Sequence, residues 1–122
     1  MKERFFILTP TPTGRVMKSP AGSDAQVYLD AEGNEMWWYA LFSLPSIGQR
    51  IYISMNGIGW ASVKGYFVSE GYLGVMTLAE NPPKWLVDQR QAAKLEPSYD
   101  SEPNWVKEGI GCEFGPEIRL SK

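Results

Sequence analysis

Histidine is absent from this chain of 122 residues, and cysteine occurs only once, at position 112. Without histidine the chain lacks the usual general base near neutral pH, so it can build neither a Ser-His-Asp nor a Cys-His catalytic arrangement. A single cysteine cannot supply the Cys and His ligands of a standard zinc site. Cys112 also has no internal disulfide partner, which fits a reducing compartment, and no neighbour that would lower its pKa. We therefore expect a partly buried thiol, no metal, no cofactor and no enzymatic activity.

The sequence also lacks phosphate-binding loops and long hydrophobic runs. Its glycine clusters at 57–59 and 109–111 do not have the spacing of a nucleotide-binding loop and are typical of turns. The apolar run at 5–8 stops at Thr9-Pro10, which is too short for a signal peptide, and no stretch approaches the roughly 20 apolar residues of a membrane span. We expect a cytoplasmic protein with no membrane partner.

The sequence also lacks a strong excess of positive or negative charge. The formal net charge is −2, divided as +3 over residues 1–20, −3 over 21–50, zero over 51–79 and −2 over 80–122. No segment forms the basic stripe that duplex-binding proteins use to neutralise phosphates. Aromatic residues, by contrast, make up 13% of the chain.

Two β-forming segments, 26–30 and 36–42, flank a Gly33-Asn34 turn and predict an N-terminal hairpin. The second segment is apolar on both pleat faces, with Met36, Trp38, Ala40 and Phe42 on one side and Trp37, Tyr39 and Leu41 on the other. Such a strand is either central and covered on both faces or exposes one face to a partner. We therefore consider homodimerisation through residues 36–42.

Residues 44–79 predict a three-stranded meander. Asn56-Gly57 is a strong hairpin turn between strands at 50–55 and 60–68, and 69–71 is a second tight turn before a strand at 72–78. In the middle strand Ala61, Val63, Gly65 and Phe67 share one predicted face, and Ser62, Lys64 and Tyr66 share the other. The interior Gly65 indicates a bulge or a sharp bend.

The meander resembles a known type of small barrel. Residues 47–53 (IGQRIYI), 56–66 (NGIGWASVKGY) and 71–75 (GYLGV) are similar to the scaffold of SH3-like barrels of the KOW and Tudor type. The resemblance covers residues 46–79 and implies a fold, not a set of binding residues. Such barrels bind peptides, modified side chains or nucleic acid.

The remaining segments complete a single domain over residues 1–122 with a barrel-like core at 44–79. We expect a short buried strand at 5–8, a long loop over 9–24, and one helix over 82–94 with Asn81 as its N-cap. Residues 95–122 should form a loop and a closing edge strand near 117–120. The fold class is thus mostly β: an SH3-like small barrel with an added N-terminal hairpin and one short helix.

The candidate binding residues are aromatic rings with one nearby cation. They are Trp60, Tyr66, Tyr72, Trp37, Tyr39 and Lys64. Trp and Tyr dominate the energetic centres of protein interfaces, but they also fill the cores of small domains. Trp60 follows a glycine-rich turn and is the ring for which exposure is best indicated.

Three alternative sites compete with this one. The segment 81–85 could form a proline-bearing docking edge, although a proline-initiated helix with Trp85 packed inward explains it much better. The loop acids Glu32/Glu35 and Asp100/Glu102 are carboxylate pairs of the kind used by glycosidases or held by divalent ions. Lys64, Arg50 and Lys84 lie near aromatics that single-stranded nucleic acid could stack on.

The leading hypothesis is a non-enzymatic protein-binding module that acts through exposed aromatics. A small acidic adaptor of this kind fits an inhibitor or accessory factor of a mobile element. The alternative is a nucleic-acid-binding accessory protein that uses the same face of the barrel.

Overall fold

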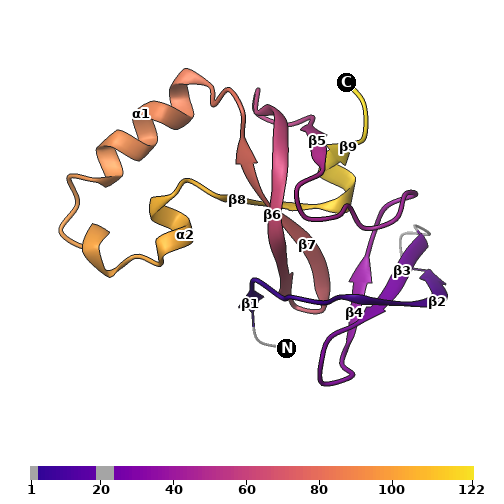
Figure 1. Ribbon diagram of the computed structural model, residues 1–122. Coiled ribbons are helices and arrows are strands. Elements are labelled where there is room, and N and C mark those ends of the chain that lie inside the picture. Colours follow the sequence, from indigo (N-terminus) through magenta and orange to yellow (C-terminus); the bar gives the residue numbers. More distant parts are fainter. Residues whose placement is uncertain (1–2, 19–23) are drawn as a thin grey trace.

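The computed structural model describes residues 3–18 and 24–122, and it is mostly β (Figure 1). The strands are β1 (Arg4–Phe5), β2 (Thr11–Lys18), β3 (Asp24–Leu29), β4 (Glu35–Trp38), β5 (Arg50–Ile53), β6 (Gly59–Ser69), β7 (Tyr72–Ala79), β8 (Gly111–Phe114) and β9 (Ile118–Arg119). The helical elements are α1 (Lys84–Ala93), the 3-10 turn η1 (Tyr99–Ser101), α2 (Asn104–Lys107) and the 3-10 turn η2 (Gly115–Glu117).

The strands form one open sheet in the order β2-β3-β4-β7-β6-β5-β9, with β1 added to β6 and β8 added to β7. The mostly-β class, the N-terminal hairpin and the helix near 82–94 are confirmed, but the barrel does not close. β9 pairs with the outer edge of β5, so it lengthens the sheet instead of joining the meander to the hairpin. The hairpin meets β7 through one parallel residue pair, Trp37 with Tyr72.

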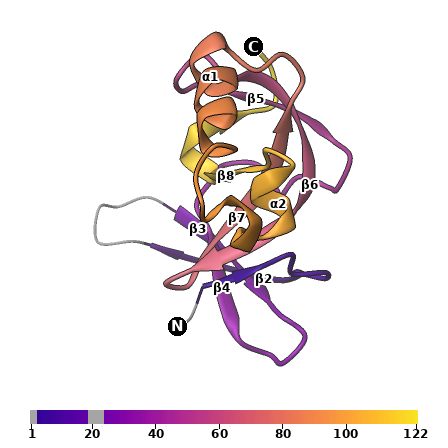
Figure 2. The same cartoon turned by 90° about the vertical axis from the view of Figure 1, so that its left-hand side faces the viewer.

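The helical segment lies on one side of the sheet, as the two views show (Figures 1 and 2). α1 begins after Pro83, which takes the N-cap position predicted for Asn81. No residue of α1 is buried, and within the described residues no helix is long and apolar enough to cross a membrane. The helix is therefore an attachment to the sheet and not part of its core.

The core lies on one face of the sheet and comes from six strands, β3, β4, β5, β6, β7 and β9. It contains Tyr28, Met36, Trp38, Ile51, Ile53, Ala61, Val63, Tyr66, Val68, Leu73, Val75 and Ile118. Met36 and Trp38 are wholly buried, and the Trp38 indole N–H donates to the Phe42 carbonyl oxygen at 2.9 Å. Of the two apolar faces predicted for residues 36–42, the face with Met36 and Trp38 therefore packs into the core, although β4 itself ends at Trp38.

The two predicted turns of the meander are present. Asn56 and Gly57 have φ of 56° and 72°, and Glu70 and Gly71 have φ of 52° and 87°. Positive φ at both central residues is the signature of the type I′ turn, whose twist matches that of the strands on either side. These two turns set the antiparallel register of β5, β6 and β7.

A β-bulge in β6 reverses the predicted faces of its second half. Val63 pairs with Thr77 and Gly65 pairs with Met76, so Lys64 is the extra residue on its strand. Beyond the bulge Tyr66 and Val68 join the core face, and Phe67 moves to the opposite face, here called the outer face. The bulge itself was predicted from Gly65, but its effect on Tyr66 was not.

The N-terminal region differs from the expected loop and buried strand. Thr11–Lys18 forms the edge strand β2, while residues 19–23 of the predicted loop lie outside the described residues. The prolines at 10 and 12 are tolerated because an edge strand leaves some N–H groups without ladder partners. Of the strand predicted at 5–8, only Phe5 is in β1, which it forms with Arg4. The prediction that this strand is buried is wrong, because Phe5 and Phe6 are exposed.

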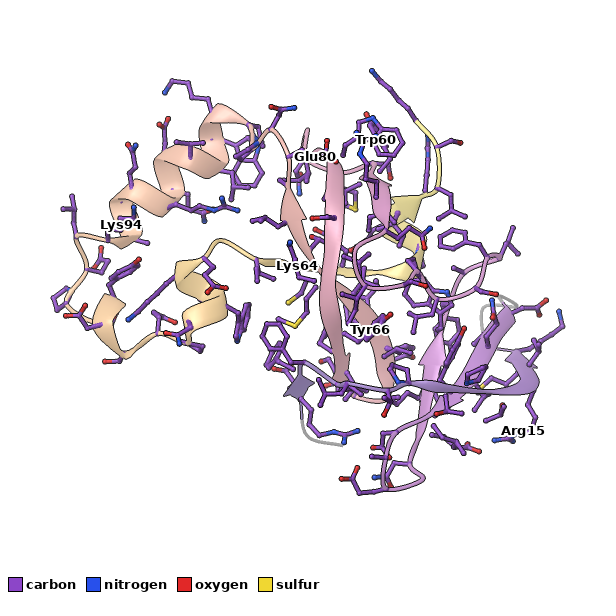
Figure 3. All side chains as sticks on the ribbon, in the orientation of Figure 1. Arg15, Trp60, Lys64, Tyr66, Glu80 and Lys94 are labelled. Carbon is purple, nitrogen blue, oxygen red and sulfur yellow. The ribbon has the colours of Figure 1, made fainter. Side chains whose placement is uncertain are left out.

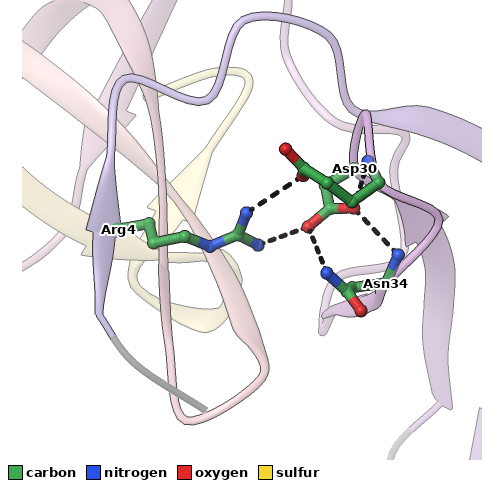
Figure 4. A network of polar contacts seen from close by, with 4 residues as sticks. Arg4, Asp30 and Asn34 are labelled. Atoms are coloured by element: carbon green, nitrogen blue, oxygen red, sulfur yellow. Dashed lines mark hydrogen bonds and ion pairs between the residues drawn. The ribbon is translucent and has the colours of Figure 1, made fainter.

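A buried carboxylate ties β1 to the hairpin (Figure 4). Asp30 accepts from the Arg4 guanidinium at 2.6 Å, from the Asn34 N–H at 2.8 Å and from the Asn34 amide at 3.2 Å. Burial alone would raise the pKa of Asp30, but these hydrogen bonds and one from the Glu32 N–H outweigh it and hold the pKa at about 2. The ionised carboxylate thus fixes the turn between β3 and β4.

Candidate functional site

Three of the five predicted aromatic residues meet on the outer face of the sheet. The Tyr72 ring lies 5.6 Å from the Trp37 ring and 5.2 Å from the Tyr39 ring, measured between centroids. The single parallel pairing between β4 and β7 creates this cluster, because it sets Trp37 directly beside Tyr72. Burial, followed by the neighbouring Tyr72 hydroxyl, raises the pKa of Tyr39.

Four further rings extend the cluster into a band across the sheet. Successive centroid distances are 6.5 Å from Tyr72 to Phe114, 5.1 Å from Phe114 to Phe67, 6.1 Å from Phe67 to Phe5 and 4.7 Å from Phe5 to Trp105. We call the seven rings the aromatic stripe; its members are Trp37, Tyr39, Tyr72, Phe114, Phe67, Phe5 and Trp105. The stripe crosses strands β4, β7, β8, β6 and β1 and ends on α2.

Glycines let the rings lie close to the backbone. A Cβ at Gly71 would stand 2.9 Å from the Trp37 ring, and one at Gly74 would overlap the Phe67 ring and lie 2.8 Å from the Glu113 carbonyl oxygen. Any larger residue at Gly74 would therefore displace Phe67 from the sheet. The interior glycine of β7 thus serves ring packing, a function that the sequence pattern alone did not indicate.

The stripe is only partly covered. Tyr72 keeps 41% of its surface exposed and Phe5 keeps 38%, whereas Phe67 is buried beneath its neighbours. The indole N–H of Trp37 is shielded from solvent and, among the described residues, has no hydrogen-bond acceptor. A contiguous, partly exposed aromatic band of this kind is typical of an interaction site.

Tyr66 does not belong to this surface, and the expectation that it is exposed is wrong. Its ring is 7% exposed and lies in the core, and its hydroxyl donates to the Pro45 carbonyl oxygen at 2.8 Å. Burial raises its pKa. The physical cause is the bulge at Lys64, which turns Tyr66 inward.

Trp60 is partly exposed but lies apart from the stripe, near the other end of β6 (Figure 3). It contacts Tyr52 at a centroid distance of 5.5 Å, and the Arg50 guanidinium carbon lies 4.5 Å from the centre of the Trp60 ring. Arg50 also forms a two-pronged ion pair with Glu80, at 2.6 and 2.9 Å. The predicted binding residues therefore divide between two places, with Lys64 exposed at the bulge between them.

Most cations near the aromatics are neutralised by carboxylates. Arg50 pairs with Glu80 and Lys84 pairs with Asp88, which removes two of the three cations considered for nucleic acid. Arg15 and Lys18, the cations of the predicted loop, pair with Glu35 and Asp24. Within the described residues the outer face thus lacks a run of unpaired positive charge.

The carboxylate pairs predicted from the sequence do not form a catalytic arrangement. Glu32 lies 3.6 Å from Arg4 and Glu35 pairs with Arg15, while Asp100 and Glu102 are exposed. Across residues 3–18 and 24–122, no group of three His, Cys, Asp or Glu side chains is placed to hold a metal ion.

A different carboxyl pair was missed by the sequence analysis. Glu113 on β8 contacts Glu117 of η2. Burial, a hydrogen bond that the protonated Glu113 donates to Glu117, and the charge of Glu117 together raise the pKa of Glu113 to about 8. The two acids flank Gly115-Pro116, and this turn brings them together. Burial and the nearby charges of Glu113 and Glu3 raise the pKa of Cys112 to about 11, so the thiol is a poor nucleophile.

The helical segment and the sheet border a cavity of about 290 Å³ that is partly open to solvent. The Trp85 indole N–H donates to the Asn56 carbonyl oxygen at 2.8 Å, and the Arg90 guanidinium donates to the Gly109 carbonyl oxygen. Trp85 is thus attached to the β5–β6 turn, although 47% of it stays exposed instead of packing fully inward.

No family model, curated protein or solved structure matches this chain.

Proposed function

We propose that this protein is a non-enzymatic binding module that docks another protein onto its aromatic stripe. The observation that carries the proposal is the continuity of the stripe: seven rings, each packed on a neighbouring ring, with Tyr72 and Phe5 more than one-third exposed. Tyr and Trp offer large rigid contact area with little loss of conformational entropy, which is why they anchor protein interfaces.

The lack of a run of unpaired positive charge on the described part of the outer face favours a protein over nucleic acid. A strand of nucleic acid needs cations to neutralise its phosphates, and here Arg50 and Lys84 already hold carboxylates. The alternative, a nucleic-acid accessory protein, would rely on Lys64 and Trp60 at the other end of β6. The two proposals differ in salt dependence, which is steep for phosphate contacts and shallow for an apolar interface.

The resemblance of residues 46–79 to KOW and Tudor barrels supports a binding function in a different geometry. In those barrels ligands bind to exposed aromatic residues near the turns. Here the sheet is open, and the aromatic rings lie together on its outer face. An inhibitor or accessory role on a mobile element, in the cytoplasm, is part of this proposal.

The second candidate partner is another copy of this chain. Leu41, in the segment considered for homodimerisation, is 98% exposed and close in sequence to Trp37 and Tyr39. Light scattering of the purified protein across a range of concentrations tests it. A monomer at every concentration excludes the homodimer, and a dimer that Leu41→Asp dissociates supports it.

The main experiment compares three tagged proteins: the wild type, Tyr72→Ser in the stripe and Leu95→Ser as the matched control. Leu95 is an exposed apolar residue just beyond α1 and outside the stripe. Proteins captured from the native host are identified by mass spectrometry, and the Kd of each purified partner is then measured. We expect Tyr72→Ser to weaken binding about tenfold or more and Leu95→Ser to leave it unchanged. Equal affinity for the wild type and Tyr72→Ser would overturn the proposal.

A further inference from the structure

The cavity beside α1 is formed by three separate parts of the chain. Its walls come from α1, from the β5–β6 turn, and from the segment that runs through α2 into β8. The hydrogen bonds from Trp85 to Asn56 and from Arg90 to Gly109 hold α1 across this space. Because α1 buries no residue of its own, the space beneath it is left unfilled by side chains.

The walls of the cavity are mainly apolar and include two indoles. Trp85 and Trp105 line it together with the aliphatic side chains of Met55, Ile58 and Ile110. A dry apolar cavity of about 150 Å³ accommodates benzene. A volume of about 290 Å³ therefore suits a flat body of two fused rings.

The charged side chains on the wall select the polar group of the ligand. Arg90 uses one of its guanidinium N–H groups on the Gly109 carbonyl oxygen, and it pairs with no carboxylate of the described residues. Glu113 is the other ionisable residue of the wall. Its raised pKa, about 8, keeps it protonated at neutral pH, so it does not oppose an anion. Among the residues that line the cavity, Arg90 therefore supplies a positive charge with unused donors.

We propose that this cavity binds a small aromatic carboxylate, with the rings between Trp85 and Trp105 and the carboxylate on the Arg90 guanidinium. The fork of guanidinium donors matches a carboxylate in geometry and charge. This site is independent of the aromatic stripe except for Trp105, which touches both. Binding here involves no covalent step.

The test uses naphthoate as the probe, with naphthalenemethanol as the neutral analogue and naphthylmethylamine as the cationic one. Binding is followed at pH 7 through the NMR signals of the Trp85 and Trp105 indole N–H groups. We expect naphthoate to shift both signals in a saturable way and to bind about tenfold more tightly than the alcohol. Equal or tighter binding of the alcohol or the amine, or no saturable shift, would overturn the proposal.

Two variants locate the charge that matters. Arg90→Gln should weaken naphthoate about tenfold, while Lys94→Gln, one turn along at the end of the same helix (Figure 3), should not. If Arg90→Gln fails to fold, Val106→Glu provides the second test, because Val106 lines the cavity, is 37% exposed and would place a negative charge there. Unchanged naphthoate affinity in a folded form of either variant contradicts the assignment.

The pH dependence of naphthoate affinity gives a further test, because Glu113 in the cavity wall ionises. Above pH 8 Glu113 becomes a carboxylate, and together with Glu117 of η2 it then repels the bound anion. The single positive charge of Arg90 on α1 opposes this repulsion. Cys112, the neighbour of Glu113 on β8, stays neutral because its pKa is about 11. Naphthoate should therefore bind severalfold more weakly at pH 9 than at pH 7, and Glu113→Gln should remove this difference. A pH dependence that persists in Glu113→Gln would show that another group controls the site.

Discussion

The free energy of unfolding of Glu113→Gln, compared with that of the wild type, should increase as the pH rises. The pKa of Glu113 is raised from its ordinary value of 4.5 to about 8 by burial and by Glu117. The folded state therefore holds a proton that the unfolded state releases between these two values. Folding stability contributed by this group is fully present below pH 4.5 and is lost as the pH rises to about 8.

The size of the effect follows from the exposure of the carboxyl group. A fully shielded acid would lose about 1.4 kcal/mol for each pH unit across this window. Glu113 is only partly buried, so water screens the penalty, and we expect a total of about 1–2 kcal/mol. In a domain of this size each kcal/mol corresponds to about 3–5 °C in melting temperature.

The assay is thermal unfolding of the wild type and Glu113→Gln at pH 5 and at pH 9, with Glu102→Gln as an exposed control. The quantity of interest is the change with pH of the difference between the two proteins, because constant effects of the amide cancel. The advantage of Glu113→Gln should grow by about 1–2 kcal/mol between these pH values, while Glu102→Gln follows the wild type. A difference that does not change with pH would refute the reasoning about the Glu113–Glu117 pair.

Three further predictions concern other groups. Because the hydrogen-bonded Asp30 has a pKa of about 2, its contribution to stability should be present above pH 3.8 and lost as the pH falls through 2; Asp30→Asn should abolish that part of the acid transition in circular dichroism. Gly74→Ala should destabilise by about 1–3 kcal/mol in urea titrations because its Cβ overlaps the Phe67 ring, whereas Gly111→Ala, with no contact closer than 3.6 Å, should cost less than about 1 kcal/mol. The raised pKa of Cys112 should make its labelling by a disulfide reagent at pH 7.5 at least about tenfold slower in the native protein than in urea; equal rates would contradict its burial.

The local features of the fold were predictable where turn chemistry and alternation agree. Asn56-Gly57 predicted the β5–β6 turn because both residues tolerate positive φ. The sequence placed Met36 and Trp38 together on one pleat face of β4, and this face packs into the core. The helix at 84–93 followed from the prolines before it and the apolar spacing within it.

The long-range features were not predictable in the same way. β2 contains a proline and a glycine, so its sequence is typical of a loop, and only its pairing with β3 makes it a strand. The open sheet depends on β9 pairing with β5 and on one parallel contact between β4 and β7, which no local pattern specifies. β8 is short and mixed in polarity, and its place beside β7 comes from tertiary contacts.

In the candidate site, some residues were predicted correctly from the sequence and others were not. Trp37, Tyr39 and Tyr72 were named from the sequence and do meet on the outer face. Tyr66 was assigned to the wrong face because alternation was counted through the bulge at Lys64. Phe5, Phe114 and Trp105 were missed because strand and helix pairings far apart in the sequence bring them together.

The most direct test of the binding proposal is oxidative footprinting of the protein alone and bound to its captured partner. In the free protein Tyr72 and Phe5, which are exposed, should be oxidised readily, and Trp60 at the other end of β6 should react to a measurable extent. Complex formation should protect Tyr72 and Phe5 about tenfold and leave Trp60 unchanged. Protection of Trp60 with continued oxidation of Tyr72 would contradict the claim that the aromatic stripe is the binding surface.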